Sequence, residues 1–472
     1  MSALTGQQLI EQLKTELGDA AVLTGDDVSG RAVGWANPAS RVARAILRPA
    51  STEQLALAVR RCADAGQPVV TYGGGTGLVA GTDTSPTEVL LSLERMNRIE
   101  TVDASGSTMT VQAGAILQSV QERAEADGFT FALDLGARGS ATVGGAIATN
   151  AGGNSVIRYG MMREQVLGLE AVLADGTVLS SMNRMLKNNA GYDLKQLFIG
   201  TEGTLGIVTR AVLRLRPAMQ SACSAFLALD RFEPIPELLK HLGSESGGTL
   251  SAFEVMWRDF YEALAETGNH DLPLGREHAY YILVEWQGGD VEQDAARFES
   301  SLAAAVEAGW IADAAIAASE RQRQAFWGMR DDIDGLREVL GDIVMFDVSL
   351  PISDAEHYTA AVFERLRARW PDEFRGVTFG HLGDSNIHFM LTTGSDDHDS
   401  HTEAMRVVYD ELRPFGGSIS AEHGIGTEKQ PYLDVSRSEE EIAVMRRLKA
   451  AFDPHGILNP GKVIAAASRA PA

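Results

Sequence analysis

Apolar and polar positions along the first half of the chain predict a mixed domain of helices and strands. Helical spacing of the apolar residues predicts helices over 5–19, 52–66 and 115–127. Shorter apolar runs predict strands over 44–49, 68–72, 88–93 and 108–111. Residues 166–179 predict a hairpin around Asp175-Gly176, and 197–217 a glycine-punctuated turn that leads into an alternating strand.

The pattern changes after Pro217. Strands are expected over 222–229, 279–286 and 343–349. Helices are expected over 232–242, 290–308 and 353–369, with a further helix over 437–452 and a frayed tail over 464–472. Strands that alternate with helices in this order predict a second α+β unit built on an antiparallel sheet.

Composition narrows the class of protein. The 472 residues are 44% hydrophobic and 22% charged, so a packed core is expected. The net charge of −23 argues against a nucleic-acid scaffold and against a polybasic membrane surface. Two cysteines exclude a disulfide scaffold and any four-cysteine metal site. The N-terminus lacks the apolar run of a signal peptide, and no apolar run is long enough for a transmembrane segment, so a cytoplasmic location is expected.

Glycine is concentrated in three turns, at 73–77, 136–153 and 200–206. The first formally matches a dinucleotide-binding fingerprint, but the next strand begins near Glu88 and leaves no room for a crossover helix. Backbone N–H groups in such turns can point at a phosphate without a helix behind them. The sequence therefore favours an extended phosphate-bearing ligand, with tight turns of a crowded sheet as the alternative.

Six motifs in order carry a resemblance to a known family. They are PVVTYGGGTGLVAG (68–81), LDLGARGSATVGGAIATNAGGN (133–154), IGTEGTLGIVTRAVLRLRP (199–217), FGHLGDSNIHF (379–389), SAEHGIGTEK (420–429) and LNPGK (458–462). The chain resembles FAD-linked dehydrogenases and oxidases of the vanillyl-alcohol-oxidase type, in the branch that oxidises D-2-hydroxy acids such as D-lactate, D-2-hydroxyglutarate and glycolate.

The resemblance implies an FAD site. The residues it implies are Gly73, Gly74, Gly75, Thr76, Gly77, Leu135, Gly136, Ser140, Gly144, Gly145, Thr149, Asn150, Gly152, Gly153, Ile207 and Asn459. Some relatives attach FAD through a His or Cys near these loops. Here the first histidine is His241, and no cysteine lies between Cys62 and Cys223, so non-covalent FAD is expected.

A second group of residues points to metal-assisted acid–base chemistry. Residues 377–391 predict a hairpin with a loop over 383–386, in a register that sets His381 opposite His388. Two such imidazoles can converge on one divalent ion, although histidines on a strand are more often surface or hydrogen-bonded residues. Glu422 and His423 follow on the next glycine-bounded loop.

The resemblance assigns roles to these residues. It implies that His381, His388 and Glu422 bind zinc or a similar divalent ion, that His423 is the base and that Arg330 binds the substrate carboxylate. Three positions depart from the D-2-hydroxyglutarate type, because Asp334, Met345 and Met390 stand where polar residues (Thr, Lys and Asn) are expected. A second substrate carboxylate would be poorly served, so D-lactate or a related apolar 2-hydroxy acid is expected, with D-2-hydroxyglutarate as the alternative.

The expected architecture is α+β: a two-part FAD-binding domain of the vanillyl-alcohol-oxidase type with an inserted α+β substrate domain on an antiparallel sheet. The boundaries are 1–217 (FAD), 218–420 (substrate and metal) and 421–472 (return to the FAD domain). The electron acceptor is expected to be an electron-transfer flavoprotein, a quinone or a cytochrome, with O2 left open. A homodimer is left open too, as are a metal-dependent hydrolase and a catalytically silent flavin-binding subunit.

Overall fold

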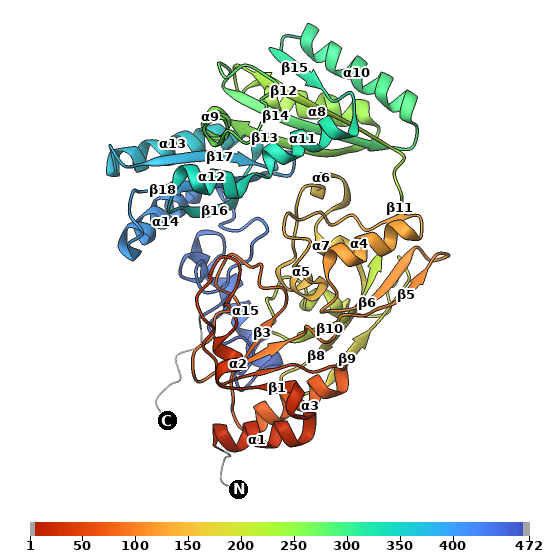
Figure 1. Cartoon of the computed structure of the whole chain (residues 1–472), viewed down its shortest axis with the longest axis vertical. Coiled ribbons are helices and arrows are strands. Elements are labelled where there is room, and N and C mark those ends of the chain that lie inside the picture. The colour runs from red at the N-terminus through yellow and green to blue at the C-terminus, as the bar shows by residue number, and fades with distance from the viewer. Residues whose placement is uncertain (1–4, 466–472) are drawn as a thin grey trace. The chain divides into compact units, whose positions relative to one another are not determined.

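The computed structural model describes residues 5–465, which form two compact units (Figure 1). The first unit comprises Met1–Gly152, Met161–Ala218 and Glu422–Ala472, as far as these are described. The second comprises Gly153–Gly160 and Met219–Ala421. The short segment Gly153–Gly160 thus leaves the first unit and joins the second, ahead of the main crossing after Ala218.

The first unit begins with a small sheet of four strands in the order β1-β2-β4-β3, in which β4 runs parallel to both β2 and β3. Its strands are β1 (Val22–Leu23), β2 (Ala45–Leu47), β3 (Val69–Tyr72) and β4 (Val89–Ser92). Its helices are α1 (Gly6–Leu17), α2 (Asp26–Ser29) and α3 (Thr52–Asp64). Thr5 closes a capping box with Gln8, and the Ser51 hydroxyl accepts from the Gln54 backbone N–H.

A second sheet in this unit is antiparallel throughout, in the order β5-β6-β10-β8-β9. Its strands are β5 (Ile99–Asp103), β6 (Thr108–Gln112), β8 (Val166–Val172), β9 (Val178–Ser181) and β10 (Ile207–Arg214). Around it lie α4 (Leu117–Ala126), α5 (Val143–Thr149), α7 (Met162–Gln165), α15 (Glu439–Phe452) and the paired short strands β7 (Phe129–Thr130) and β11 (Arg216–Pro217). One hydrophobic core joins the two sheets and includes Leu13, Val59, Val111, Leu213 and Leu458.

The second unit is built on a seven-stranded antiparallel sheet in the order β15-β12-β14-β13-β17-β18-β16. The strands are β12 (Ser221–Leu229), β13 (Leu250–Trp257), β14 (Tyr280–Gly288), β15 (Asp313–Ile316), β16 (Val344–Ser349), β17 (Arg375–Gly380) and β18 (Asn386–Thr392). The helices are α6 (Val156–Tyr159), α8 (Pro234–Ser246), α9 (Arg258–Thr267), α10 (Val291–Glu307), α11 (Glu320–Arg330), α12 (Ile333–Leu340), α13 (Ala355–Arg369) and α14 (His398–Leu412).

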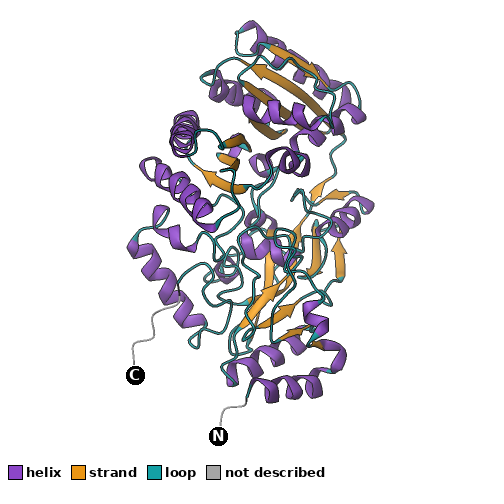
Figure 2. Cartoon of the chain, turned by 60° about the vertical axis from the view of Figure 1, so that its left-hand side comes forward, coloured by secondary structure: helices purple, strands orange, loops and turns teal. Residues whose placement is uncertain are grey.

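Helices cover both faces of this larger sheet (Figure 2). On one face α9, α11 and α12 bury Phe260, Phe326 and Leu336 against Met256 and Phe379. On the other face the aromatic side chains of α10 and α13 pack on the sheet, with the pairs Phe298–Trp286 and Phe363–Phe389 at ring separations of 5.2 and 5.8 Å. The first of these two faces also carries His388, which lies opposite Phe379.

The prediction for the hairpin that carries the two histidines was wrong in register. Phe379, not His381, lies opposite His388, because a 3-10 turn at Leu382–Asp384 replaces the expected loop. His381 comes directly after β17, and Ser385 closes the turn in the left-handed conformation (φ 75°).

Candidate active site

A cavity of about 320 Å³ lies in the first unit, walled by the three glycine-rich turns. Stretches of 71–82, 135–151 and 198–208 contribute most of its lining. Three further lining residues come from the C-terminal segment: Glu422, His423 and Asn459. Segments far apart in sequence therefore converge on one space, as the phosphate-ligand interpretation of the glycine turns requires.

Glycine serves two purposes in this wall. A Cβ on Gly74 would collide with the Ser140 carbonyl oxygen, so two loops can touch here only because the side chain is absent. A Cβ on Gly77 or Gly136 would meet nothing within 4 Å, so these positions leave the cavity open. Thr142 fixes the start of α5, since its hydroxyl accepts from the Gly145 backbone N–H at 3.2 Å. The cavity is thus bounded by backbone, which suits an extended ligand with phosphates.

The structure places twelve of the sixteen expected cofactor residues in the cavity wall. They are Gly73, Gly74, Gly75, Thr76, Gly77, Leu135, Gly136, Gly144, Gly145, Thr149, Ile207 and Asn459. Four lie outside this lining. Ser140 is exposed, Asn150 caps α5 and accepts from the Arg163 backbone N–H at 2.9 Å, Gly152 is buried, and Gly153 belongs to the second unit.

Glu202 lines the same cavity and was missed in the sequence. Its two carboxylate oxygens accept from the backbone N–H groups of Ile425 and Gly426, at 2.6 and 2.9 Å. Burial raises the pKa of Glu202, against the opposing effect of these two donors. The glycines of the SAEHGIG loop permit this bend, with φ of +90° at Gly424 and +53° at Gly426. Glu202 therefore holds in place the loop that begins with Glu422 and His423.

The second unit brings His381 and His388 together. Their rings lie 5.3 Å apart, and a nitrogen of one lies within 4.8 Å of a nitrogen of the other. Both are buried, at 5% and 7% exposure. The two rings lie close together although the register differs from the predicted one, because His381 follows Phe379, the cross-strand partner of His388, by two residues.

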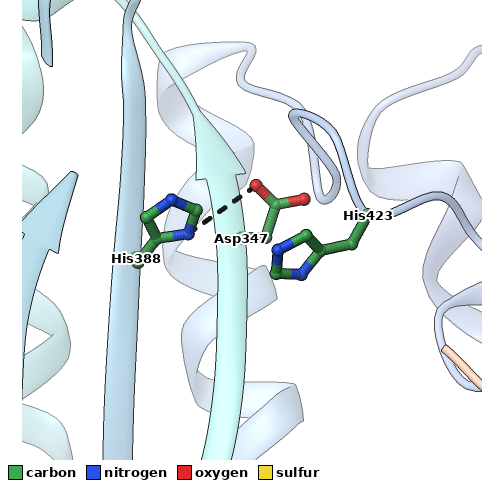
Figure 3. A group of neighbouring side chains, drawn as sticks. All are labelled: Asp347, His388 and His423. Atoms are coloured by element: carbon green, nitrogen blue, oxygen red, sulfur yellow. Dashed lines mark ion pairs between the residues drawn. The ribbon is translucent and has the colours of Figure 1, made fainter. Parts of the chain in front are cut away.

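Asp347 is a further buried polar residue next to His388, and it was not predicted as a site residue. The two residues face each other across β16 and β18, with Asp347 Oδ1 3.9 Å from His388 Nδ1 (Figure 3). The other oxygen, Oδ2, accepts from the Ser420 hydroxyl at 3.1 Å. In the sequence, Asp347 could have been recognised as a single carboxylate inside the otherwise apolar strand VMFDVS.

Arg330 lies at the end of α11 and shares a buried carboxylate with His381. Glu254 on β13 accepts from Arg330 Nε at 2.8 Å through one oxygen, and its other oxygen lies 2.7 Å from His381 Nδ1. Complete burial would raise the pKa of Glu254, but the charges of His381 and Arg330 outweigh burial and lower it to about 2. Arg330 Nη1 also lies 3.3 Å from Asp331. Glu254 was not predicted either.

The three positions that depart from the D-2-hydroxyglutarate type belong to the same unit as these histidines. Met345 stands directly opposite Met390 across β16 and β18, two pairs along from Asp347 and His388 and so on the same face. Met390 is buried in the core with Met329 and Phe379. Asp334 lies in the first turn of α12. The side chains of Met345 and Met390 therefore make the sheet apolar next to His388.

The donor set fits a divalent transition metal. The imidazole nitrogens of His381 and His388 lie close enough together to share one ion, and imidazole is a ligand that zinc and similar ions accept. Glu422 and His423 belong to the first unit and follow Ser420 by two and three residues.

Two family models match the chain, one described as an FAD binding domain over residues 43–181 and the other as the C-terminal domain of FAD linked oxidases over residues 218–463. A D-2-hydroxyglutarate dehydrogenase of Xanthomonas citri pv. viticola is 38% identical over 426 residues, which cover 89% of each chain. The chain belongs to the FAD-linked oxidase family. The mitochondrial D-2-hydroxyglutarate dehydrogenase of Bos taurus is 35% identical over 92% of this chain and 79% of the relative.

Other comparisons extend this assignment. A mitochondrial protein of Schizosaccharomyces pombe, provisionally named a D-lactate dehydrogenase, is 34% identical over 93% of this chain and 85% of the relative. Among solved structures, p-cresol methylhydroxylase matches with a TM-score of 0.76 at 16% identity, covering 98% of both chains. The fold is thus the α+β vanillyl-alcohol-oxidase type expected from the sequence. Within residues 5–465 the structure contains no helix long and apolar enough to cross a bilayer.

Proposed function

We propose that this FAD-dependent 2-hydroxyacid dehydrogenase oxidises a D-2-hydroxy acid to the 2-oxo acid, with His423 as the base that takes the hydroxyl proton. The observation that carries the proposal is that His423 and Glu422 line the same cavity as the glycine turns. A bound FAD supplies the acceptor for the hydride from C2. An imidazole suits the proton, because its ordinary pKa lies close to neutrality.

We further propose that His381, His388 and Glu422 hold a zinc or similar divalent ion. Support comes from the convergence of the two imidazoles and from chain order, since Glu422 follows Ser420, which is hydrogen bonded to Asp347. Such an ion supplies Lewis acidity that makes the hydroxyl group of a bound substrate easier to deprotonate. Arg330 is proposed to bind the substrate carboxylate, with Glu254 fixing the Nε edge of its guanidinium.

The comparisons favour D-2-hydroxyglutarate over D-lactate, the reverse of the order expected from the sequence. Most of the relatives described here carry the D-2-hydroxyglutarate name, so this dicarboxylate is the first candidate substrate. One observation supports a second candidate substrate, D-lactate or a longer apolar homologue. Met345 and Met390 form an apolar cross-strand pair next to Asp347 and His388, and thioethers offer nothing to a second carboxylate.

Several finer points stay predictions. Non-covalent attachment of FAD is supported by the cavity lining, in which His423 is the sole histidine and cysteine does not occur. The metal's identity, the electron acceptor (an electron-transfer flavoprotein, a quinone or a cytochrome), a homodimeric state and a cytoplasmic location are likewise predictions from the sequence.

The visible spectrum of the purified protein tests the proposal, recorded before and after anaerobic addition of D-2-hydroxyglutarate or D-lactate. A flavin band near ~450 nm that bleaches with one acid supports the oxidation and names the substrate type. A yellow protein bleached by neither acid would point to the silent flavin subunit or another substrate. A colourless protein that stays colourless with added FAD would favour the metal hydrolase. His423→Asn is the matched variant, expected to slow bleaching by about 10²–10⁴-fold.

A further inference from the structure

Helix α11 presents two arginines, two turns apart, to the larger sheet of the second unit. Arg323 and Arg330 are separated by seven residues, so they share one stripe of the helix. Each meets a buried glutamate. Arg323 Nη1 lies 2.9 Å from Glu285 on β14, and Arg330 Nε lies 2.8 Å from Glu254 on β13.

The two glutamates occupy equivalent places on the sheet. Glu285 pairs with Ala252, which lies two residues before Glu254, so both carboxylates point to the face that α11 covers. Glu285 is 2% exposed and Glu254 is 1% exposed. Each arginine therefore neutralises a carboxylate that would otherwise be costly to bury.

The remaining partners of the two glutamates differ. Glu285 accepts from the Trp327 indole N–H at 2.8 Å and from the Ser224 hydroxyl at 2.9 Å, which are ordinary structural contacts. Glu254 instead places its second oxygen 2.7 Å from Nδ1 of His381. One of two otherwise similar pairs thus reaches a proposed metal ligand.

The contact with Glu254 places a hydrogen on Nδ1 of His381, because an ionised carboxylate can only accept. Arg330 Nη2 lies 3.4 Å from Nδ1 and 3.2 Å from Nε2 of the same ring. The carboxylate at Nδ1 and the guanidinium beside Nε2 together fix the orientation of the ring.

We propose that Glu254 is a positioning residue for the metal centre: it sets the orientation of the His381 ring and fixes Arg330 beside it. The inference rests on the proposed metal-assisted function. Partners of this kind behind a ligating histidine raise its basicity and fix the direction of its lone pair. Because the same carboxylate holds the Nε edge of Arg330, it also ties the proposed carboxylate-binding group to the proposed metal ligand.

The test compares Glu254→Gln with Glu285→Gln in the full-length, FAD-loaded enzyme. The probes are Zn²⁺ and Co²⁺, with dissociation constants measured by competition with a chelator. Glu254→Gln is expected to weaken binding by about 10- to 100-fold, the usual effect of losing such a partner. Glu285→Gln removes an equally buried, arginine-paired carboxylate and is expected to leave metal affinity unchanged.

The outcomes separate this inference from the proposed function. Equal affinity in the wild type and Glu254→Gln, or equal loss in both variants, overturns the role of Glu254 alone. A wild type that binds neither ion overturns the metal proposal together with it.

A measurement on the unaltered protein covers the case in which Glu254→Gln does not fold. In the metal-free enzyme with ¹⁵N-labelled histidine, the shifts of His381 should report the Nδ1–H tautomer. The Nε2–H tautomer would overturn the inference.

Discussion

The side-chain oxygen of Asn459 accepts a hydrogen bond from the backbone N–H of Thr71 at 2.8 Å, across 388 positions of the chain. Its amide nitrogen donates to the Thr71 hydroxyl at 3.0 Å and to the carbonyl of Glu202. One buried amide thus joins the strand that enters the first glycine turn, the turn around Glu202 and the C-terminal LNPGK motif. These are three of the walls of the cavity.

Asn459→Ala should therefore loosen the cavity. The buried N–H of Thr71 would lose its acceptor, a loss of about 1–3 kcal/mol. We expect a lower free energy of unfolding and weaker FAD retention, measured by chemical denaturation and by the fluorescence of released flavin. Asn188→Ala, at an exposed position, is the control. Unchanged flavin affinity in Asn459→Ala would show that this amide does not contribute to FAD binding.

Glu202→Ala should disturb the loop that carries Glu422 and His423. The backbone N–H groups of Ile425 and Gly426 would lose both acceptors in a buried setting. A displacement of about 1 Å in a reacting group can cost on the order of 10² in rate, so we expect kcat/KM to fall by that order. Glu202→Gln keeps one accepting oxygen and should lose less. Steady-state kinetics at full flavin occupancy checks this, and equal losses in the two variants would argue against loop placement as the cause.

Met345→Lys combined with Met390→Asn should shift substrate preference toward D-2-hydroxyglutarate. The two side chains face each other across β16 and β18, so the new polar groups would lie together. A hydrogen bond to a charged group contributes ~1.5–3 kcal/mol, which corresponds to about tenfold or more in kcat/KM. The check is the ratio of kcat/KM for D-2-hydroxyglutarate to that for D-lactate. If the wild type already prefers the dicarboxylate strongly and the variant has the same ratio, the methionine pair does not determine substrate specificity.

Asp259 should make stability depend on pH. Burial raises its pKa to about 7, although the backbone N–H groups of Thr378 and Phe260 donate to it at 3.0 and 2.7 Å. In the unfolded chain an aspartate titrates near ~3.9. The folded state therefore binds the proton more tightly, and the resulting stabilisation is complete below about pH 4 and is lost as the pH rises through about 7.

Asp259→Asn removes this titration while keeping an oxygen that can accept both N–H groups. Relative to the wild type, the variant should gain stability between pH 5 and pH 8, as measured by denaturant unfolding at fixed flavin occupancy. A difference in unfolding free energy that stays constant over this range would contradict the raised pKa.

Removal of a metal should separate the two parts of the proposed site. A chelator is expected to lower the rate of flavin bleaching by substrate while the protein stays yellow, because the glycine-walled cavity contains neither His381 nor His388. Activity should return with Zn²⁺ or Co²⁺. Full activity after exhaustive chelation, with the metal content confirmed as nil, would reject the metal-assisted mechanism.

Local signals in the sequence predicted most of the scaffold. The helix over 52–66 is α3, and the Asp175-Gly176 turn joins β8 to β9, because capping and turn residues act within a few positions. The register around His381 could not be predicted in this way, since it depends on a 3-10 turn that ends at a left-handed serine, Ser385.

The residues that were missed share a cause. Glu254 acts on His381 from 127 positions away, and Glu202 acts on Gly426 from 224 positions away. Glu254 is a single carboxylate in an apolar strand, and Glu202 lies in the motif at 199–217 without any local sign of its partner. Their partners become apparent only when the chain is folded, whereas Gly77, His388 and Asn459 belong to motifs that are recognisable in the sequence.

The division of the chain also sets an order for folding during synthesis. Every strand of the seven-stranded sheet has been translated by Thr392, whereas the first unit still lacks Leu458, which bridges to Val69, and Asn459. Domains generally fold as units while the chain emerges. The part of the protein translated first must therefore wait, with its glycine turns unclosed, until the last residues leave the ribosome, and a nascent chain stalled before Leu458 should carry a finished second unit and no flavin.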